Sequence, residues 1–481
     1  MNDVIQYIIQ FLVRGKDDIS RYIGYTSDTE VFNQYKIVII PSGFFDKGLY
    51  GTAECRVNSQ TMLLRHCGLD PQSPANKEIL KQVQDDVVVT FNSEHDTESM
   101  PQLPLNHIEN IPLLFGTPEI EQFNDTLVVH ADIIASSFFL LSRYEEIVRR
   151  NVRDEHGRFP GKESLPYRAG FIHRPIVDLY GKLLRKWLAN TGITLETDKH
   201  PSHPKIYLTH DADEPFYCRT WRNVFRIVSK GTSLWEAIRL KMGRLETDPY
   251  HTFPWLLDED KRFCNQHPNT QVIFFFKTGG KAKQDRPHYS QNDKDIRSLM
   301  QLISRFDAQI GLHSSYEAAG SPKQLSVETE RFRKMDNPQK SPFHRSHFLA
   351  SREPEHMNRI EQAGFTDDFT VGYADVVGFR LGTAHAVRYI NPVEMRLSPT
   401  LHLHPLVIMD STLSSGKYMG LSEDEAFTHC RSIIEEIKEV NGELVVLWHN
   451  SSFAEGVGYH RSLYHQLLNL NFMGGFKTPL H

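Results

Sequence analysis

Acidic and imidazole side chains follow three apolar segments in the second half of the chain. Asp211 and Asp213 come just after IYLTH. His313 ends the segment QIGLH, and His449 ends LVVLWH. Carboxylates and neutral imidazoles are ligands of zinc and similar divalent ions, and a bound ion polarises a carbonyl and lowers the pKa of its water. A second carboxylate can take the proton of that water, while a histidine protonates the leaving amine. These residue types indicate metal-assisted hydrolysis.

The elements that would position these side chains are short strands that alternate with helices. Four apolar runs have the pattern of buried strands: 205–211, 271–277, 309–313 and 443–449. Helical patterns lie at 295–306 and at 421–440, where Ser422 and Glu425 predict a capping box. Repeated units of this kind favour a parallel α/β sheet or barrel, in which the carboxyl ends of the strands meet at one face.

The segment FHRSHFL (343–349) adds Arg345 and His347 between helical patterns at 323–335 and 355–364. A single histidine after a strand is more often a hydrogen-bonded structural residue than a ligand. Several strands that each deliver a carboxylate or an imidazole to the same end are harder to explain by packing. We therefore expect these side chains to share one site.

Four segments, in this order, resemble the motifs of polysaccharide deacetylases, the NodB-homology carbohydrate esterases: THDADEP (209–215), GLHSSYE (311–317), HRSHFL (344–349) and LVVLWHN (444–450). The sequence around these motifs is similar to that of a bacterial subgroup of this family. In that subgroup an uncharacterised domain comes before the deacetylase domain, and FFLLSRYEE (138–146) resembles part of it. The resemblance implies an α/β fold, with a distorted (β/α) barrel of the polysaccharide deacetylase type preceded by a smaller α/β domain.

The resemblance also implies the activity and the roles of the residues. The activity is hydrolysis of N- or O-linked acetyl groups from a carbohydrate, in surface polysaccharide biosynthesis, by a hydrolase of non-peptide C–N bonds with a divalent ion, most often Zn²⁺. Asp211 would be the general base, Arg345 would orient it, and His449 would be the general acid. Asp213 and His313 would bind the metal.

The sequence does not decide which residue would be the third metal ligand. The family motif has a second histidine four residues after His313, but Glu317 stands there. Either this carboxylate or His347, which replaces a proline-like position of the family, could complete the site. Two alternatives to a carbohydrate deacetylase follow: a catalytically degenerate barrel that binds glycan or acts as a scaffold, and a hydrolase of non-sugar amides.

Two domains are predicted from the length of 481 residues. An uncharacterised N-terminal α/β domain would cover 1–200, and the barrel would cover 204–481, with the polar, proline-bearing stretch 197–204 as the linker. Within the first domain, about 56–100 is predicted to be an insertion, because RHCGLDPQSPANKEILKQVQDD (65–86) resembles the translation of a repetitive genomic element. The alternative is an ordinary surface loop with one short helix.

Composition excludes several other classes of protein. The chain has 54 Lys and Arg against 60 Asp and Glu, a net charge of −6, so no global basic field would attract nucleic acid or an anionic membrane. Its five cysteines contain no CxxC pair, which favours a reducing compartment, and the expected location is cytoplasmic. The longest apolar run, 131–141, is too short to span a membrane and predicts a buried helix. The oligomeric state is left open.

Overall fold

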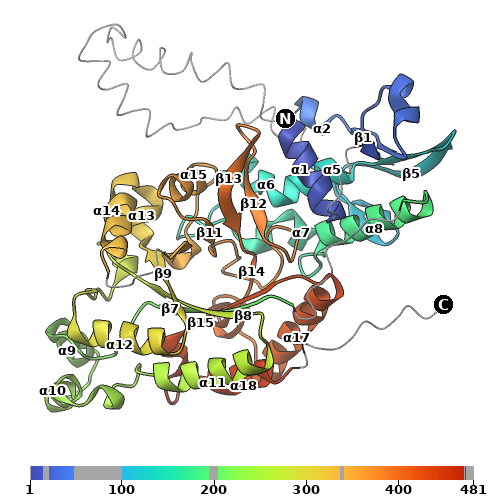
Figure 1. Ribbon diagram of the computed structural model, residues 1–481. Coiled ribbons are helices and arrows are strands. Elements are labelled where there is room, and N and C mark those ends of the chain that lie inside the picture. The colour runs from blue at the N-terminus through green and yellow to red at the C-terminus, as the bar shows by residue number, and fades with distance from the viewer. Residues whose placement is uncertain are drawn as a thin grey trace, which may run out of the picture. The chain divides into compact units, whose positions relative to one another are not determined.

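The computed structural model describes residues 2–14, 21–47, 100–193, 204–335, 341–470 and 472 (Figure 1). The predicted insertion at 56–100 lies outside the described residues except for Met100. The predicted linker at 197–204 also lies outside them except for Pro204.

Contacts between residues divide the chain into two compact units. The first combines Met1–Arg150, Tyr180–Glu196 and Ile390–Leu397. The second combines Asn151–Leu179, Thr197–Tyr389 and Ser398–His481. The segment Asn151–Leu179, which the predicted boundary assigns to the first domain, therefore makes its contacts with the second unit.

The first unit contains a four-stranded sheet. Its strands lie in the order β1 (Ile23–Tyr25), β2 (Ile37–Ile39), β6 (Thr126–Ala131) and β5 (Gly116–Phe123). The first three are parallel, and β5 is antiparallel to β6. A separate antiparallel pair joins β3 (Asn106–Ile108) to β4 (Ile111–Leu113). Its helices are α1 (Asn2–Val13), α2 (Phe44–Lys47), α5 (Ile133–Leu141), α6 (Tyr144–Val148) and most of α8 (Ile176–Asn190).

The predicted buried helix is α5. Asp132 caps its start by accepting a hydrogen bond from the backbone N–H of Ala135 at 2.9 Å. All nine residues of α5 are buried, and seven of them are apolar, as expected of a helix that is buried on every side. Among the described helices, none is long and apolar enough to cross a membrane.

The second unit is built on a curled nine-stranded sheet (Figure 1). From one edge to the other the strands are β12 (Val387–Asn391), β13 (Arg396–Leu403), β11 (Asp367–Asp368), β10 (Phe343–Ser346), β9 (Gln309–Ser314), β8 (Thr270–Phe276), β7 (Ile206–Ala212), β15 (Leu444–His449) and β14 (Leu406–Met409). The pairs from β13 to β14 are parallel. The four strands predicted from apolar runs are present, as β7, β8, β9 and β15.

The second unit also contains helices, most of which connect these strands. They are α7 (Leu165–Arg168), α9 (Trp221–Ser229), α10 (Leu234–Met242), α11 (Phe253–Gln266), α12 (Lys294–Arg305), α13 (Tyr316–Gly320), α14 (Pro322–Arg333), α15 (Glu355–Gln362), α16 (Asp410–Ser414), α17 (Glu423–Glu439) and α18 (His460–Leu468). The predicted capping box of Ser422 and Glu425 is formed at the start of α17. Figure 1 shows α11 and α12 along one face of the sheet, where they contact β8 and β9.

Alternation of side chains along each strand separates two faces of the sheet. One face, inside the curl, carries a buried apolar cluster that includes Tyr207, Ile273, Phe275, Phe343, Val445 and Leu447. The neighbouring positions Ile206, Leu208, Val446 and Trp448 instead lie with Tyr464 and Leu467 of α18. The inner face therefore takes the odd-numbered positions of β7, β8, β10 and β15.

Candidate active site

The predicted site residues continue the inner face at the carboxyl ends of the strands. Asp211 is two residues beyond Thr209 on β7 and is in register with His449 on β15. His313 on β9 is likewise in register with Arg345 on β10. Residues in register on neighbouring parallel strands point to the same face, so the fold brings these four side chains together.

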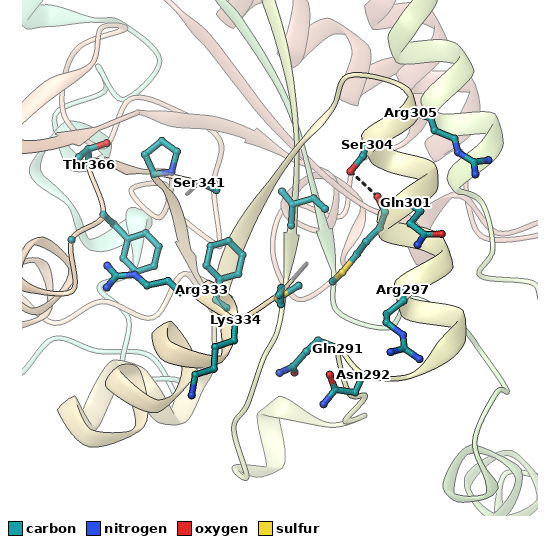
Figure 2. Close-up of a pocket in the computed structure, with 17 residues that line it drawn as sticks. Gln291, Asn292, Arg297, Gln301, Ser304, Arg305, Arg333, Lys334, Ser341 and Thr366 are labelled. Carbon is teal, nitrogen blue, oxygen red and sulfur yellow. Dashed lines mark hydrogen bonds between the residues drawn. The ribbon is translucent and has the colours of Figure 1, made fainter. Parts of the chain in front are cut away.

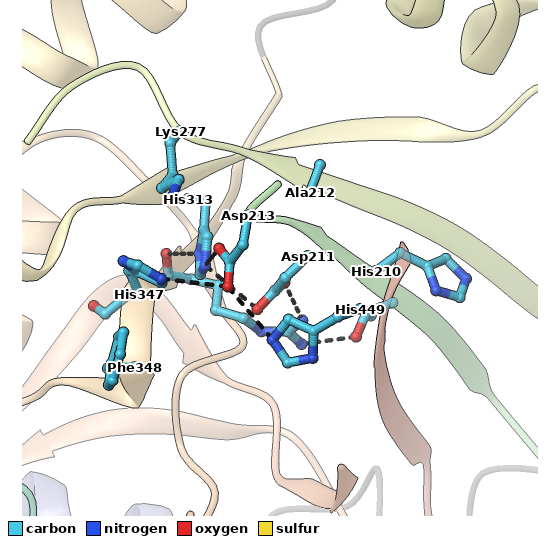
Figure 3. Close-up of polar contacts among 12 residues, drawn as sticks. His210, Asp211, Ala212, Asp213, Lys277, His313, His347, Phe348 and His449 are labelled. Carbon is cyan, nitrogen blue, oxygen red and sulfur yellow. Dashed lines mark hydrogen bonds and ion pairs between the residues drawn. The ribbon is translucent and has the colours of Figure 1, made fainter. Parts of the chain in front are cut away.

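A cavity of about 360 Å³ lies at this edge of the sheet. It is lined by Arg158, Asp211, Asp213, His313, His347, Phe348, Leu349, Met409, Ser411, Tyr418, Leu447, His449, Ser451 and Ser452. Figure 3 shows Asp213 near the centre of the group, with His313 and His347 on one side and His449 on the other.

Asp213, His313 and His347 form a group that could hold a metal ion. One oxygen of Asp213, Oδ1, lies 3.1 Å from Nε2 of His313. The other, Oδ2, lies 3.3 Å from Nε2 of His347. One ligand atom from each residue lies within 4.8 Å of the others. A carboxylate and two imidazoles that converge in this way are a donor set suited to zinc and related ions.

The protonation of His313 supports this interpretation. Its Nδ1 lies 3.0 Å from the carbonyl oxygen of Arg345, which can only accept, so Nδ1 carries the proton. In the neutral imidazole, Nε2 then presents a lone pair to the cavity, and it faces the acceptor Oδ1 of Asp213. Both atoms are buried and have no hydrogen-bond partner among the described residues. A cation between two buried acceptors would stabilise both.

His347 is oriented by a buried carboxylate, Asp285. Nδ1 of His347 lies 3.0 Å from Oδ1 of Asp285, which also accepts from the N–H of Tyr316 at 2.7 Å. Burial alone would lower the pKa of His347, but the charge of Asp213 and hydrogen bonds to Asp213 and Asp285 raise it. Hydrogen bonding of the second nitrogen to a carboxylate is the usual support of a metal-binding histidine.

Asp213 is held in its charged form. Burial alone would raise the pKa of its carboxyl group, but the charges of His347 and Lys277 and the hydrogen bond from His347 hold it well below its ordinary range. Lys277 is itself buried at the end of β8, where its Nζ donates to the carbonyl oxygen of Asp285 at 3.2 Å. The cationic neighbours explain why this partly buried carboxylate remains ionised.

Asp211 is fixed by Arg345, which is fully buried. Nη1 of Arg345 donates to Oδ1 of Asp211 at 2.9 Å, and Nη2 donates to Oγ1 of Thr209 at 2.8 Å. Nε donates to the carbonyl oxygen of Phe369 at 3.0 Å, so all three guanidinium nitrogens have an acceptor. The second oxygen of Asp211, Oδ2, lies 3.4 Å from Nε2 of His313. Asp211 therefore directs one oxygen toward the candidate metal ligands.

His449 faces Asp213 from the opposite side of the group. Its Nε2 lies 3.6 Å from Oδ2 of Asp213, and its Nδ1 lies 2.8 Å from Oδ1 of Asp410. Burial alone would lower the pKa of His449, but the charge and hydrogen bond of Asp410 raise it to about 10. Burial would raise the pKa of Asp410, and the charge of His449 lowers it to about 2. The pair therefore keeps a proton on His449.

Glu317 is not part of this group. It lies on α13, where its carboxylate accepts a hydrogen bond from the N–H of Lys281 at 2.6 Å. It does not line the cavity. His347 lies where the third ligand is needed because the turn at His347–Leu349 continues β10 directly past Arg345. Of the two alternatives for the third ligand, the geometry therefore favours His347.

Arg158 was not predicted, because it comes from the segment before the sheet. Its guanidinium donates to Oδ2 of Asp154 at 2.7 Å, to the hydroxyl of Tyr418 at 3.0 Å and to the carbonyl oxygen of Phe348 at 3.2 Å. Phe348 has a left-handed backbone, with φ 61° and ψ 14°. Such strain persists where neighbouring contacts impose it. Arg158 thus fixes the cavity wall around Phe348.

Asp410 and Asp285 were not among the predicted site residues either. Asp410 directly follows the apolar run LVIM (406–409), as Asp211 follows its own strand, so position after a strand could have found it. Asp285 lies nine residues past the end of β8 in a short 3-10 turn, Lys283–Asp285. Neither spacing nor alternation relates that turn to His347.

A second, larger cavity of about 750 Å³ lies at the opposite ends of β9, β10 and β11 (Figure 2). Its walls include the end of α12 and the end of α14. The seventeen residues that line it include Arg297, Arg305, Arg333 and Lys334 but no histidine, aspartate or glutamate. Although it is larger, this cavity offers no acid–base pair and no metal ligands, and the candidate chemistry belongs to the cavity at the carboxyl ends.

Comparisons with known proteins give two similarities. Residues 3–192 match a family of unknown function, DUF7033, over less than half of the chain. No curated protein matches the chain. Among solved structures, the chain is similar to a Mycobacterium smegmatis protein described as a polysaccharide deacetylase, with 12% identity and a TM-score of 0.37, over 56% of this chain and 84% of that chain.

Proposed function

We propose that the second unit is a metal-dependent hydrolase that removes acetyl groups from a carbohydrate, on a distorted (β/α) barrel of the polysaccharide deacetylase type. The observation that carries the proposal is the arrangement around the two unpartnered atoms, Oδ1 of Asp213 and Nε2 of His313. A fixed carboxylate, Asp211, and a protonated imidazole, His449, lie on different sides of that group.

Asp213, His313 and His347 would hold the ion, and Zn²⁺ suits one carboxylate with two imidazoles. When bound, the ion would polarise the acetyl carbonyl and lower the pKa of a water. Three protein ligands leave a coordination position open, as catalytic rather than structural sites do. Two features of these residues suit a bound metal ion: Nε2 of His313 has no hydrogen-bond partner among the described residues, and Asp285 accepts a hydrogen bond from His347.

The protein residues on the two sides supply the proton transfers. Asp211 accepts the proton of the attacking water, and Arg345 keeps the carboxylate turned toward the site. His449 donates a proton to the leaving nitrogen or oxygen as the acetyl group departs. Asp410 holds the imidazole ring in the orientation that directs Nε2 into the cavity.

The walls of the cavity support a carbohydrate substrate. Ser411, Ser451, Ser452 and the hydroxyl of Tyr418 offer hydrogen-bond donors and acceptors. Phe348 adds a partly exposed aromatic ring on the same lining. Polar groups with an aromatic face suit a polyhydroxylated ring better than a small apolar ligand.

The test is release of acetate by the purified protein from a panel of N- and O-acetylated sugars, with small cyclic amides as the comparison set. Wild-type protein loaded with zinc is expected to release acetate, while Asp211→Asn loses turnover and keeps its metal content. Hydrolysis of the amides alone would support the non-sugar amide alternative. Glycan binding without hydrolysis of either set would support a degenerate barrel.

A further inference from the structure

A helical hairpin, α9 with α10, exposes an unusual amount of apolar surface. Ten large hydrophobic side chains are the most exposed among the described residues, and half of them are on this hairpin. These five are between 55% and 83% exposed: Trp221, Phe225, Leu234, Trp235 and Met242. Single exposed apolar residues are ordinary, but five on two short helices mark an interaction surface.

The exposure is not a result of missing packing within the hairpin. Cys218, Val224, Ile227 and Ala237 form a buried cluster between the two helices. Trp221 and Phe225 are four residues apart and share the outer face of α9. Trp235 and Met242 are seven residues apart and share the outer face of α10. Each helix therefore has an apolar face toward its partner and a second apolar face toward solvent.

The two outer faces meet at a cation–aromatic contact. Nζ of Lys241 on α10 lies 4.6 Å from the centre of the Trp221 ring on α9. Lys241 also lies seven residues after Leu234, so Leu234 is on the face of α10 that contacts Trp221 through Lys241. The exposed side chains therefore belong to one region of the surface.

This region is strongly basic although the whole chain is acidic. Residues 216–244 contain seven cations (Arg219, Arg222, Arg226, Lys230, Arg239, Lys241 and Arg244) and one acid (Glu236). Arg219 pairs with Asp295, and Arg226 pairs with Glu214. Among the described residues, Arg222, Lys230, Arg239 and Arg244 make no ion pair with an acid. The hairpin thus combines exposed aromatic side chains with unneutralised positive charge.

We propose that the α9–α10 hairpin docks on an anionic membrane surface. Tryptophan, phenylalanine and leucine enter the boundary between headgroups and acyl chains, while arginine and lysine bind lipid phosphates. A second copy of the chain meets the same surface less well, because a two-fold interface would place the seven cations of one hairpin against those of the other. Neither helix crosses the bilayer, so the docking is peripheral.

The hairpin is attached to the edge of the sheet that carries the candidate site. It follows β7 after a loop of residues 213–220, and Arg226 on α9 pairs with Glu214, the residue after Asp213. The side chain of Asn450 donates to the carbonyl oxygen of Glu214 at 3.1 Å, which ties this loop to the residue after His449. A docked hairpin would therefore hold the carboxyl edge of the sheet close to the lipid surface.

The experiment is co-sedimentation of the full chain with two kinds of vesicles, phosphatidylcholine alone and phosphatidylcholine with phosphatidylglycerol. Wild-type protein is expected to bind the anionic vesicles and to release them as salt is added. The double variant Arg222→Gln with Arg239→Gln should weaken binding about 30-fold. Each cation contributes roughly one kcal/mol to binding, and about 1.4 kcal/mol corresponds to a tenfold change in affinity. Phe225→Ser with Trp235→Ser should weaken it about tenfold or more.

The matched control is Arg297→Gln with Arg305→Gln, which removes two exposed cations from α12 instead. It is expected to bind as the wild type does, and circular dichroism checks that every variant is folded. Equal sedimentation with both kinds of vesicles, or no loss in either hairpin variant, would overturn the proposal. A dimer in solution that Phe225→Ser with Trp235→Ser abolishes, with no vesicle binding, would assign the surface to a second copy.

Discussion

Two groups of buried histidines in the second unit differ in how their ring nitrogens are satisfied. In the core, His210 and His344 have both ring nitrogens bonded to protein. His210 contacts the carbonyl oxygen of Trp448 at 3.2 Å and Asp260 at 3.0 Å. His344 contacts Asp368 at 2.6 Å and the hydroxyl of Ser314 at 2.8 Å. Such rings have no capacity left for a ligand, and their role is structural.

In the cavity, one nitrogen is held and the other is presented. Nδ1 of His313, His347 and His449 is bonded to Arg345, Asp285 and Asp410, respectively. Nε2 of each faces Asp213, at 3.1, 3.3 and 3.6 Å. The difference teaches that burial and histidine content do not mark a site. A fixed ring with one nitrogen directed into a cavity does.

Replacing Asp410, the hydrogen-bond partner of the proton donor His449, should have the largest effect on turnover. In Asp410→Asn, a neutral amide replaces the carboxylate that holds and charges His449. We expect turnover to fall by about 10² to 10⁴, the usual contribution of a general acid, while zinc affinity stays unchanged. Kinetics of acetate release and a zinc titration measure the two quantities.

Ser452→Ala is the comparison for that variant, since it removes a hydrogen bond of 2.6 Å to Asp410 and one hydroxyl of the cavity wall but leaves the charge of Asp410 in place. Its turnover should fall far less. Full activity of Asp410→Asn would mean that His449 does not donate the proton.

A core histidine should affect stability instead. His404 lies between Glu443 at 2.8 Å and Asp367 at 3.0 Å. Burial would lower its pKa, but these carboxylates raise it from 6.5 to about 9. Because the folded-state pKa is the higher one, the stabilisation is complete below pH 6.5 and is lost as the pH rises through about 9. It amounts to about 3 kcal/mol.

Urea unfolding at several pH values between 6 and 10 (roughly the span of the two pKa values) measures this dependence. In His404→Gln the protein should be less stable at pH 6.5, and the part of the slope that comes from this ring should disappear. An unchanged slope would show that His404 is not charged in the folded protein.

Replacing Asp285, which holds the proposed metal ligand His347, should have a smaller effect. Asp285→Asn keeps an acceptor for Nδ1 of His347 but removes the negative charge, so zinc affinity should fall about tenfold. Glu328→Gln is a matched control, because Glu328 is a buried carboxylate that accepts from Ser315 at the same turn and does not contact His347. An equal loss in both variants would assign the effect to general destabilisation.

Much of the site could be predicted from the sequence because strand ends and alternation are local properties. The apolar runs predicted β7, β9 and β15. Asp211, His313 and His449 come at the ends of these runs. Alternation also separates neighbours, since His210 and Asp211 must lie on opposite faces of β7. Of these two, His210 is the one bonded within the core.

The remainder depends on contacts between distant segments. Arg158 lies 190 residues before Phe348, and Asp285 lies 62 residues before His347, with no spacing that relates them. The position of a residue in a family motif can also mislead. Glu317 occupies the motif position of the third ligand, but His347 is the residue that lies beside Asp213 and His313. Net charge is an average as well, so a value of −6 conceals the seven cations of the α9–α10 hairpin.

A zinc titration against a competing chelator, with wild-type protein, His313→Ala and Glu317→Gln, tests the central claim most directly. The account predicts one ion per wild-type chain, affinity weakened by about 10² to 10³ in His313→Ala, and wild-type affinity in Glu317→Gln. Unchanged affinity in His313→Ala, or a large loss in Glu317→Gln, would contradict it.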